Sequence, residues 1–466
     1  MRPDSWSYPM SSPALSPAAL IAERPFSSYQ RVVLGICLLI GLLDGYDALT
    51  IGYVIPAIAE DWGVSAGSLT PAVTAGLVGL VIGAITLGAL GDRRGRRLVV
   101  ITGFSVFAVF SGAIAFAPNM FTLAVLRFLA GVGLGAVLPS LIALSVEYSP
   151  TRRKALSAIV VGTSSVSLGG ILGAALSAYL VPVFNWQSVF LVGGILPLLV
   201  LPLVVRLLPE SLAFLSTPER EGEVRRVLAR IDPELGQVPL ALEPATVQSK
   251  APLGVLFADR RAPLTILLWI SYFCGYCLTF IVSTWMPALL DDAGQTSSVS
   301  IWATALSTVG AVIGAMTQGY FIDRRRQDYG LLGVGYLLGV PIIIALVNSM
   351  TSAPLVILFA VLLGLLSLAP VACMAALSAN LYPASARATG VGWALTMARI
   401  GSIVGPLVVG ILIQQGLAPS TIFSLACVPT GLAAVSVTVL ARRARAELRR
   451  QSEIHVAADQ KTHSAI

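Results

Sequence analysis

Two carboxylic acids stand inside the first long apolar run of the sequence, in Leu-Leu-Asp44-Gly-Tyr-Asp47-Ala-Leu. The run extends from Val32 to Ile55 and contains no other Asp, Glu, Lys or Arg. A spacing of three places both carboxyls on one face of a helix, about one turn apart. A charge at bilayer depth costs roughly 2.5–3.5 kcal/mol, and apolar surroundings and a nearby like charge favour the protonated carboxyl. The pair therefore predicts a proton-binding site inside a membrane.

Two arginines, Arg127 and Arg399, also lie within apolar runs. At helical rise, Asp44 is about 20 Å from the start of its run near Arg31, and Arg127 is about 12 Å from the opposite end of its own run near Asn119. In a hydrocarbon core about 30 Å thick, the aspartates and Arg127 then share a depth, and Arg399 lies near the midplane. An aspartate pair facing an arginine can exchange protons or hold an anion. The alternative is a buried ion pair that only fixes helix positions.

The elements that must hold these charges are membrane-spanning helices. The chain is 56% hydrophobic and only 11% charged, whereas a soluble domain carries about 25% charge. At about 20 apolar residues per span, the sequence predicts an all-α membrane protein of twelve spans, with centres near residues 43, 80, 107, 133, 168, 198, 275, 310, 340, 367, 400 and 429.

The basic residues follow the even-numbered spans. They account for the net charge of +7 without a nucleic-acid partner, and the six connections after odd-numbered spans contain no Lys or Arg. The positive-inside rule then places both termini and the central loop in the cytoplasm. The predicted organisation is a disordered cytoplasmic N-terminus (1–30), a six-helix half (31–208), a central loop (209–260), a second six-helix half (261–441) and a cytoplasmic tail (442–466). Within the central loop, the Glu/Arg mixture from Glu219 to Arg226 predicts a short surface helix that Pro233 ends.

The two halves repeat one another at an offset of 231 residues. Gly88-x-x-x-Asp92-Arg93-Arg94 returns as Gly319-x-x-x-Asp323-Arg324-Arg325, and Pro139 returns as Pro370. The same offset carries the intramembrane charges of the first half onto uncharged residues, namely Gly275, Leu278 and Leu358. Since the shared scaffold does not require these charges, we interpret them as functional. Two related six-helix halves are typical of one large transporter class that binds its substrate between them near the midplane.

The segment Gly88-x-x-x-Asp92-Arg-x-Gly95-Arg96-Arg97 resembles the loop motif of the major facilitator superfamily. The resemblance implies the major facilitator fold, a single-chain transporter and a cytoplasmic latch of ion pairs. The second copy departs from the motif, because Arg326 stands where Gly95 stands in the first. The residues expected to form this cytoplasmic gate are Gly88, Asp92, Arg93, Arg96, Glu147, Arg152, Asp323 and Arg324. Glu210, in Pro209-Glu210-Ser211, resembles another superfamily signature and is interpreted as structural.

A narrower resemblance, to the aromatic acid:proton symporter family, rests on motifs in both halves. They are Asp44-Gly-x-Asp47, Arg127 with its glycine run, Glu147-Tyr-x-Pro, and Arg387-Ala-Thr-Gly-Val-Gly-Trp393 followed by Arg399-Ile-Gly. The resemblance implies proton-driven uptake of benzoate-like, hydroxybenzoate-like or phenylpropionate-like acids across the bacterial inner membrane. The residue spacing by itself supports only a proton-coupled anion carrier.

In the predicted mechanism Asp44, Asp47 and Arg127 couple protons to transport. Arg399 is expected to bind the substrate carboxylate, since a guanidinium presents a matching planar fork. Aromatic residues on span 7, with Tyr272 and Tyr276 among them, recur every three or four positions, and Tyr46 lies between the aspartates; these rings are candidates to stack on an aromatic substrate. No cofactor and no metal site are expected, and the proton gradient supplies the energy.

Three alternatives stay open. A proton-driven efflux antiporter would use the same fold and buried carboxylates, although the span 5 stretch from Gly162 to Gly170 lacks the Gly-Pro pair common in such proteins. A symporter of a non-aromatic organic anion fits the same charges. A non-transporting sensor or enzyme is the third, but the sequence offers no nucleophile–base pair, metal cluster or phosphate loop for it. The sequence does not identify the acid.

Overall fold

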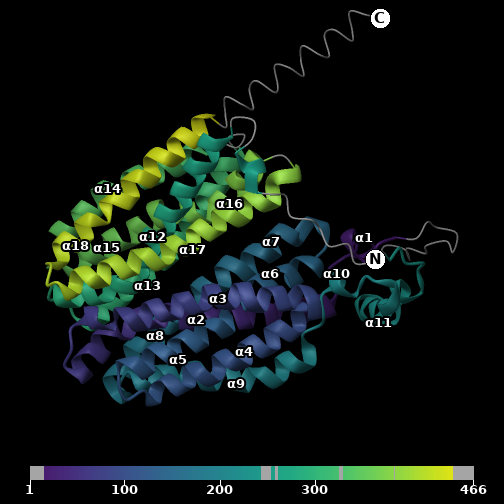
Figure 1. The fold of residues 1–466 in the computed structure, drawn as a ribbon, viewed down its shortest axis with the longest axis horizontal. Coiled ribbons are helices and arrows are strands. Elements are labelled where there is room, and N and C mark those ends of the chain that lie inside the picture. The colour runs from purple at the N-terminus through teal and green to yellow at the C-terminus, as the bar shows by residue number, and fades with distance from the viewer. Residues whose placement is uncertain (1–14, 243–252, 258–260, 325–328, 383, 444–466) are drawn as a thin grey trace, which may run out of the picture. The chain divides into compact units, whose positions relative to one another are not determined.

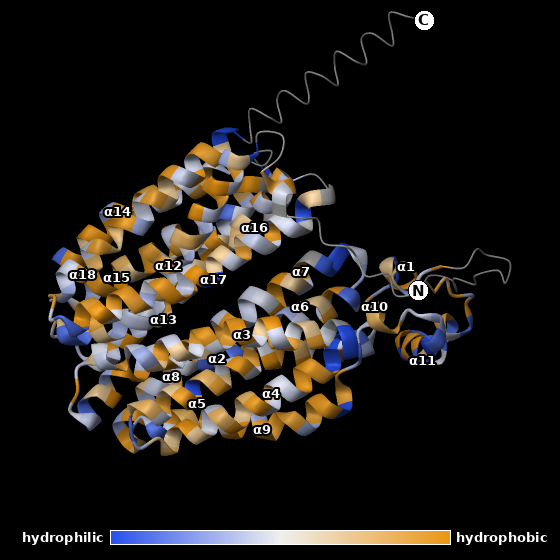
Figure 2. Cartoon of the chain, viewed as in Figure 1, coloured by the Kyte–Doolittle hydropathy of each residue, from blue (hydrophilic) through white to orange (hydrophobic). Residues whose placement is uncertain are grey.

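The computed structural model describes residues 15–242, 253–257, 261–324, 329–382 and 384–443. Across these residues the chain is helical, and it forms no β-strand beyond one isolated bridge between Leu15 and Leu240. Apolar residues run along the helices and hydrophilic ones gather at helix ends, whereas the short helix α11 (Glu221–Ile231) carries both kinds (Figure 2). This distribution is that of a protein with a bilayer as its solvent.

Within the described ranges, twelve helical segments are long and apolar enough to cross a membrane, as the sequence predicts, and all twelve predicted centres fall within them. We number them spans 1–12. In the first half they are span 1, α2 (Ser28–Trp62); span 2, η1 (Ala66–Leu69) with α3 (Thr70–Arg94); span 3, α4 (Arg96–Ala113) with η2 (Ile114–Phe116); span 4, α5 (Met120–Leu134) with α6 (Val137–Glu147); span 5, η3 (Thr151–Arg153), α7 (Lys154–Ile159), η4 (Val160–Ser164) and α8 (Ser165–Phe184); and span 6, α9 (Gln187–Leu207).

The second half continues the same pattern. Its spans are span 7, α12 (Ala262–Asp292); span 8, α13 (Ser297–Arg324); span 9, α14 (Gly330–Asn348); span 10, α15 (Ala353–Leu363), η8 (Gly364–Leu368) and α16 (Pro370–Leu381); span 11, α17 (Ala384–Gln414); and span 12, which begins with α18 (Pro419–Leu425) and continues to Arg443. The chain divides into two compact units, one made of residues 1–50, 71–173 and 180–248 and the other of residues 51–70, 174–179 and 249–466.

Glycines set the closest helix contacts in each half. A Cβ on Gly79 or Gly83 of α3 would collide with backbone of α5, at Phe128 and Val132 respectively. In the second half Gly310 and Gly314, which follow them by the same 231 residues, face the backbone of Val361 and Leu365 in span 10. Small residues let membrane helices approach until their backbones touch. The sequence repeat is therefore also a repeat of packing.

Spans 4 and 10 are irregular at corresponding positions. Span 4 is interrupted at Gly135 and Ala136, between α5 and α6, and span 10 contains the π-helical turn η8. A proline follows each irregularity, Pro139 in the first half and Pro370 in the second. Because proline lacks an N–H and crowds the preceding turn, it favours such local rearrangements of the helical hydrogen bonds.

Span 1 is pressed against span 5 along one face. A side chain at Gly41 or Gly45 would collide with Ser165 or Val166 of α8, and one at Gly169 would collide with Leu42. Gly45 lies between the two aspartates. The contact therefore fixes the rotation of α2 about its axis and, with it, the direction in which the aspartate face points.

The N-terminal segment and the central loop pack together. The short helix α1 (Pro17–Ala22) precedes span 1, and Arg24 forms an ion pair with Asp232, just after α11. The predicted surface helix is confirmed as α11, which buries Val224, Leu228 and Ile231 on one face and is followed by a 3-10 helix, η6 (Pro233–Gln237). In Figure 1, α1 and α11 lie together beyond one end of the first-half helices. Residues 15–30 of the segment predicted to be disordered thus contain a helix with defined contacts.

Candidate functional site

Asp47 is the centre of a buried polar cluster in the first half. Its Oδ1 accepts a hydrogen bond of 2.9 Å from the hydroxyl of Ser111 on span 3, and its Oδ2 forms a 3.1 Å ion pair with Nη1 of Arg127 on span 4. Asp47 is 5% exposed and Arg127 is 6% exposed. The structure thus brings together two of the residues that the sequence assigns to proton coupling, and three different spans meet at one carboxylate.

Arg127 is held in place by the close packing of spans 2 and 4. A Cβ on Gly76 would lie 3.4 Å from both Nε and Nη2 of Arg127, so the guanidinium occupies space that a larger residue would crowd. Among the described residues, Nε of Arg127 has no hydrogen-bond partner although it is buried. Arg127 is thus a buried charge with one bond to its counter-ion and one donor without a described partner.

Asp44 and Tyr46 flank this cluster on α2. Asp44 is buried, with 6% of its surface exposed. The Tyr46 hydroxyl donates a 2.7 Å hydrogen bond to the carbonyl oxygen of Val189 on span 6, and its ring packs over Gly193, where a Cβ would lie 3.0 Å away. In this structure the Tyr46 ring is therefore enclosed between spans 1 and 6.

Aromatic rings form a ladder along α12 in the second half. Tyr272 and Tyr276 stack with centroids 6.3 Å apart, and Tyr276 and Phe280 stack at 6.4 Å. The Tyr272 hydroxyl shares a 3.0 Å hydrogen bond with that of Ser378, and its ring is buried, whereas Tyr276 is only half-buried. Tyr272 thus anchors the ladder, and Tyr276 presents its more accessible face.

Arg399 of α17 accompanies this ladder. Its guanidinium lies within electrostatic range of the Tyr276 side chain. It is half-buried, and across the described side chains no carboxylate lies within ion-pair distance of it. A cation without a protein counter-ion beside an aromatic ring is an arrangement that suits an aromatic carboxylate.

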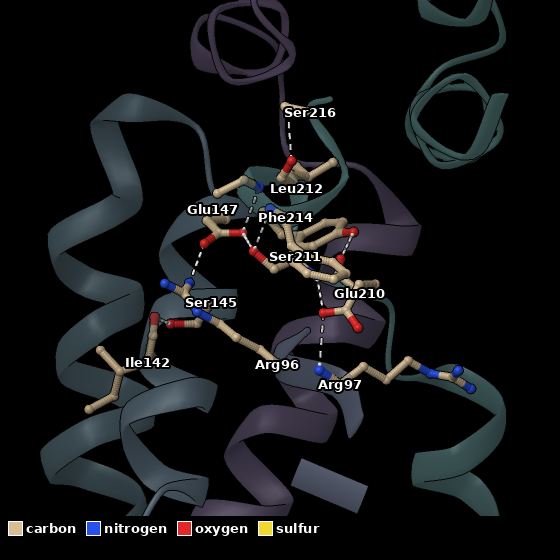
Figure 3. Close-up of polar contacts among 12 residues, drawn as sticks. Arg96, Arg97, Ile142, Ser145, Glu147, Glu210, Ser211, Leu212, Phe214 and Ser216 are labelled. Carbon is tan, nitrogen blue, oxygen red and sulfur yellow. Dashed lines mark hydrogen bonds and ion pairs between the residues drawn. The ribbon is translucent and has the colours of Figure 1, made fainter. Parts of the chain in front are cut away.

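A second polar cluster joins the ends of spans 3, 4 and 6 (Figure 3). Arg96, at the first residue of α4, forms an ion pair with Oε1 of Glu147 at the last residue of α6. Oε2 of Glu147 accepts a 2.7 Å hydrogen bond from the Ser211 hydroxyl and a 3.3 Å bond from the backbone N–H of Ala213. The predicted pairing of Glu147 with an arginine of the span 2–3 loop is present in the structure, and Arg96 is the arginine involved.

Glu210 completes this cluster and explains the motif glycine. Its carboxylate accepts hydrogen bonds from the backbone N–H groups of Arg97 (3.1 Å) and Ser211 (2.8 Å). Gly95 has a φ of +97°, and a Cβ there would collide with the Glu210 carboxylate. Only glycine combines this backbone conformation with so close an approach. The interpretation of Glu210 as structural agrees with these contacts.

The other residues predicted for the gate lie outside this cluster. Arg93 and Arg152 are exposed, and Gly88 has open space where a Cβ would be. Arg324 donates a 2.9 Å hydrogen bond to the Tyr320 hydroxyl one turn earlier on α13. The side chains of Asp92 and Asp323 lie outside what the structure describes.

Two contributors to these clusters escape sequence reasoning. Ser111 holds Asp47, and Arg97 donates side-chain hydrogen bonds to the carbonyl oxygens of Leu208 (2.8 Å) and Val205 (2.6 Å). A serine within an apolar span is common, so its type gives no signal. Arg97 belongs to the quoted loop motif, but the sequence does not reveal that it reaches the end of span 6.

Comparisons with known proteins agree with this architecture. The family model of the Major Facilitator Superfamily matches residues 37–295 and 268–463. A gallate transporter of Pseudomonas putida is 36% identical over 90% of this chain and 93% of its own length. The 4-hydroxybenzoate transporter PcaK of Pseudomonas aeruginosa is 35% identical over 90% of this chain and 94% of its own.

Solved structures share the fold at lower identity. A D-xylose-proton symporter superposes with a TM-score of 0.66 at 15% identity, over 88% of this chain and 97% of its own. A bacterial homologue of the human lysosomal transporter Spinster, in an inward-facing and unoccupied conformation, gives a TM-score of 0.63 at 16% identity, over 90% and 96% of the two chains.

Proposed function

We propose, since this chain belongs to the major facilitator superfamily, that it takes up a small aromatic carboxylate together with protons across the bacterial inner membrane. The chain is a multi-pass membrane transporter and not an enzyme. Its curated relatives include transporters of gallate, 4-hydroxybenzoate and benzoate. The proposal extends their substrate class, and not any one of their acids, to this protein.

The observation that carries the substrate assignment is the pairing of Arg399 with the aromatic ladder of α12. In this proposal the Arg399 guanidinium binds the carboxylate and Tyr276 stacks on the aromatic ring. Tyr272, hydrogen-bonded to Ser378, positions Tyr276. Tyr46 and Tyr272, both enclosed in the present structure, would contact substrate only if they became exposed during the transport cycle.

The proton-coupling assignment rests on the cluster around Asp47. A proton arriving from outside binds to the Asp44/Asp47 pair and weakens the attraction between Asp47 and Arg127. The guanidinium of Arg127, whose Nε has no partner among the described residues, can then move between spans 2 and 4. Because the charge cluster exists in only one half, that half would respond to the proton while the other holds the acid.

The Arg96–Glu147 cluster is proposed to hold together the helix ends that form the cytoplasmic gate. Both termini are proposed to lie in the cytoplasm, on the same side as this gate. It fastens the loop after span 2 to the ends of spans 4 and 6 within one half. Asp92, Arg93, Arg152, Asp323 and Arg324 would supply the contacts that open and close. A single chain suffices for this cycle, and no cofactor enters it.

An uptake assay tests the substrate class. Proteoliposomes with an imposed inward proton gradient would be supplied with labelled benzoate, 4-hydroxybenzoate, gallate, a phenylpropionate and an aliphatic acid, with and without a protonophore. We expect accumulation of at least one aromatic acid that the protonophore abolishes. Accumulation of the aliphatic acid alone would assign a non-aromatic anion, and outward transport in right-side-out vesicles would assign an antiporter.

Two variants test the residues. Asp44→Asn/Asp47→Asn is expected to lose accumulation against a gradient while still exchanging substrate between equal pools; accumulation equal to that of the unmodified protein would overturn the coupling assignment.

Arg399→Lys keeps the charge but loses the planar fork, so the substrate concentration for half-maximal uptake should rise about tenfold, as expected for 1–2 kcal/mol. Arg226→Lys on α11, remote from both clusters, is the matched control. An unchanged value for Arg399→Lys would remove Arg399 from the carboxylate site.

A further inference from the structure

A cavity of about 510 Å³ lies in the first half, between the start of span 1 and the start of span 5. Its polar wall carries Arg31 and Arg153. Its apolar wall is made of Phe26, Leu34, Leu156 and Val160. None of these residues belongs to the proton-coupling cluster or to the aromatic ladder.

The cavity lies beside the close contact between spans 1 and 5. The two helices meet at Gly41 and Gly45, where an added Cβ would collide with Ser165 and Val166. The residues that line the cavity, 26–34 and 153–160, precede this contact along both segments. The lining ends at the first residue of the π-helical turn η4 (Val160–Ser164), and π-bulges are among the features at which helices kink.

The two arginines bring uncompensated positive charge to this space. Arg31 donates a 3.1 Å hydrogen bond to the Ser28 hydroxyl, and the Arg153 guanidinium lies 5.8 Å from the centroid of the Phe26 ring. Over the described residues, neither has a carboxylate within ion-pair distance.

Two acids of the same half are already engaged with other arginines. Glu147 pairs with Arg96, and Asp232 pairs with Arg24. The guanidinium groups of Arg31 and Arg153, both exposed, are therefore available to an anionic ligand.

The apolar surface next to the arginines continues toward the middle of the membrane. Arg31 and Arg153 lie at the first turns of spans 1 and 5, where a helix that crosses the bilayer would meet the lipid headgroups. Deeper along span 5, Leu156 is 56% exposed and Ile159 is 53% exposed. A ligand for this cavity would thus combine an anionic head at the interface with a long apolar body that extends inward.

We propose that the cavity binds one anionic phospholipid, with its phosphate between Arg31 and Arg153 and an acyl chain along Leu34, Leu156 and Val160. Guanidinium groups bind phosphate oxygens through paired hydrogen bonds, and basic pockets between spans are typical sites for acidic headgroups. The lipid fills the cavity between the starts of spans 1 and 5. This site is independent of the acid that the protein transports.

Native mass spectrometry of the full-length protein with dioleoylphosphatidylglycerol tests the proposal. We expect one strongly retained lipid, and about a tenfold loss of its retention in Arg31→Gln/Arg153→Gln. The matched control, Arg206→Gln/Arg226→Gln, removes the same charge from the end of span 6 and from α11 and should retain the lipid. Dioleoylphosphatidylethanolamine, which has no net charge, should bind equally weakly to all three proteins. Equal retention of the anionic lipid by both double variants would overturn the site.

A second variant separates charge from shape and guards against misfolding. Leu156→Trp fills the cavity without a change of charge, so it should also release the anionic lipid, whereas Leu168→Trp, exposed on α8 outside the cavity, should not.

Competition with added 4-hydroxybenzoate completes the test. If this small acid displaces the lipid, and if its own binding is lost in Arg31→Gln/Arg153→Gln, the cavity is a carboxylate site and the lipid proposal is wrong.

Discussion

Asp47 and Arg127 differ in what each can do when its partner is removed. A buried carboxyl can become neutral by binding a proton, whereas a guanidinium stays charged at any accessible pH. Asp47→Asn leaves Arg127 charged and unpaired, so it should lower the free energy of unfolding by on the order of 3–5 kcal/mol. Arg127→Gln should lower it by less, because Asp47 can then become neutral. Thermal unfolding of the purified protein in detergent measures the order of the two variants.

The double variant Asp47→Asn/Arg127→Gln is the control for this prediction. It removes both charges and leaves two neutral groups that can hydrogen-bond, so it should recover much of the stability lost in Asp47→Asn alone. If Arg127→Gln proved the more damaging change, the guanidinium would act mainly through its packing beside Gly76 rather than by balancing Asp47.

Glu147 makes more contacts than its ion pair. Arg96→Glu should place two carboxylates together and reduce uptake strongly, by tenfold or more. The exchange Arg96→Glu/Glu147→Arg restores the opposite charges, but an arginine at 147 cannot accept the hydrogen bonds that Ser211 and Ala213 now donate. Rescue of initial uptake rates should therefore be partial. Full rescue would mean that the ion pair alone matters and that the bonds to Ser211 and Ala213 contribute nothing.

At the scale of single residues, sequence reasoning succeeds where a side chain is improbable in its surroundings. Asp47 and Arg127 are conspicuous because each interrupts an apolar run, and counting depth places them together. Ser111 and Arg97 give no such signal. A serine can satisfy itself on its own helix, and an arginine among four at a helix end has no unique direction, so their partners emerge only from the fold.

At the scale of helices, Gly79 offers a direct test of how closely spans 2 and 4 approach. Alanine there would place a Cβ against the backbone carbonyl of Phe128, which cannot move aside. We expect Gly79→Ala to lower stability by about 1–3 kcal/mol, the range for overpacking. Gly310→Ala, at the equivalent position of the second half, should behave alike because it meets the carbonyl of Val361. Thermal unfolding in detergent provides the measurement.

Gly35→Ala is the control for these substitutions. Its Cβ would meet no atom within 4 Å, so the substitution should be neutral or slightly stabilising, given the better helix propensity of alanine. A loss of stability in Gly35→Ala as large as that in Gly79→Ala would show that loss of glycine itself, and not contact with span 4, is responsible.

The number and positions of the spans follow from hydropathy, because every residue of a span reports on the same apolar surroundings. The irregular turns do not. The π-turn η4 in span 5 carries no proline and no charge, so nothing in its sequence distinguishes it from ordinary helix. The sequence also does not show which helices pack together. Gly41 and Gly79 contact a neighbouring helix, whereas a Cβ on Gly35 would meet nothing within 4 Å, and the sequence does not distinguish the two kinds of glycine.

At the scale of the whole molecule, the repeat and the charges give different information. The offset of 231 residues predicts equivalent packing, which Gly79 and Gly310 display. The charged cluster of Asp47 and Arg127 breaks the symmetry, because its equivalents in the second half are uncharged. In our proposal, a scaffold of two similar halves therefore carries two different tasks, proton binding in one half and recognition of the acid in the other.

Orientation in the membrane is the remaining property of the whole molecule that charge predicts. Arg93, Arg94, Arg152 and Arg153 lie at one set of helix ends, and Glu60, Asp61, Asp291 and Asp292 lie at the opposite set. Basic residues are retained in the cytoplasm during insertion. The connection that carries α11 should therefore face the cytoplasm, and the connection before α13 should face outward.

Single cysteines test this orientation in a background that lacks the five native ones. Ser298→Cys, exposed at the start of α13, should react with a membrane-impermeant maleimide on intact cells, and Glu223→Cys, exposed on α11, should react only after permeabilisation. The two sites control for each other, because both are exposed and both should react fully once the membrane is open. Labelling of Glu223→Cys on intact cells would invert the topology, and the basic clusters would then lie outside against the charge rule.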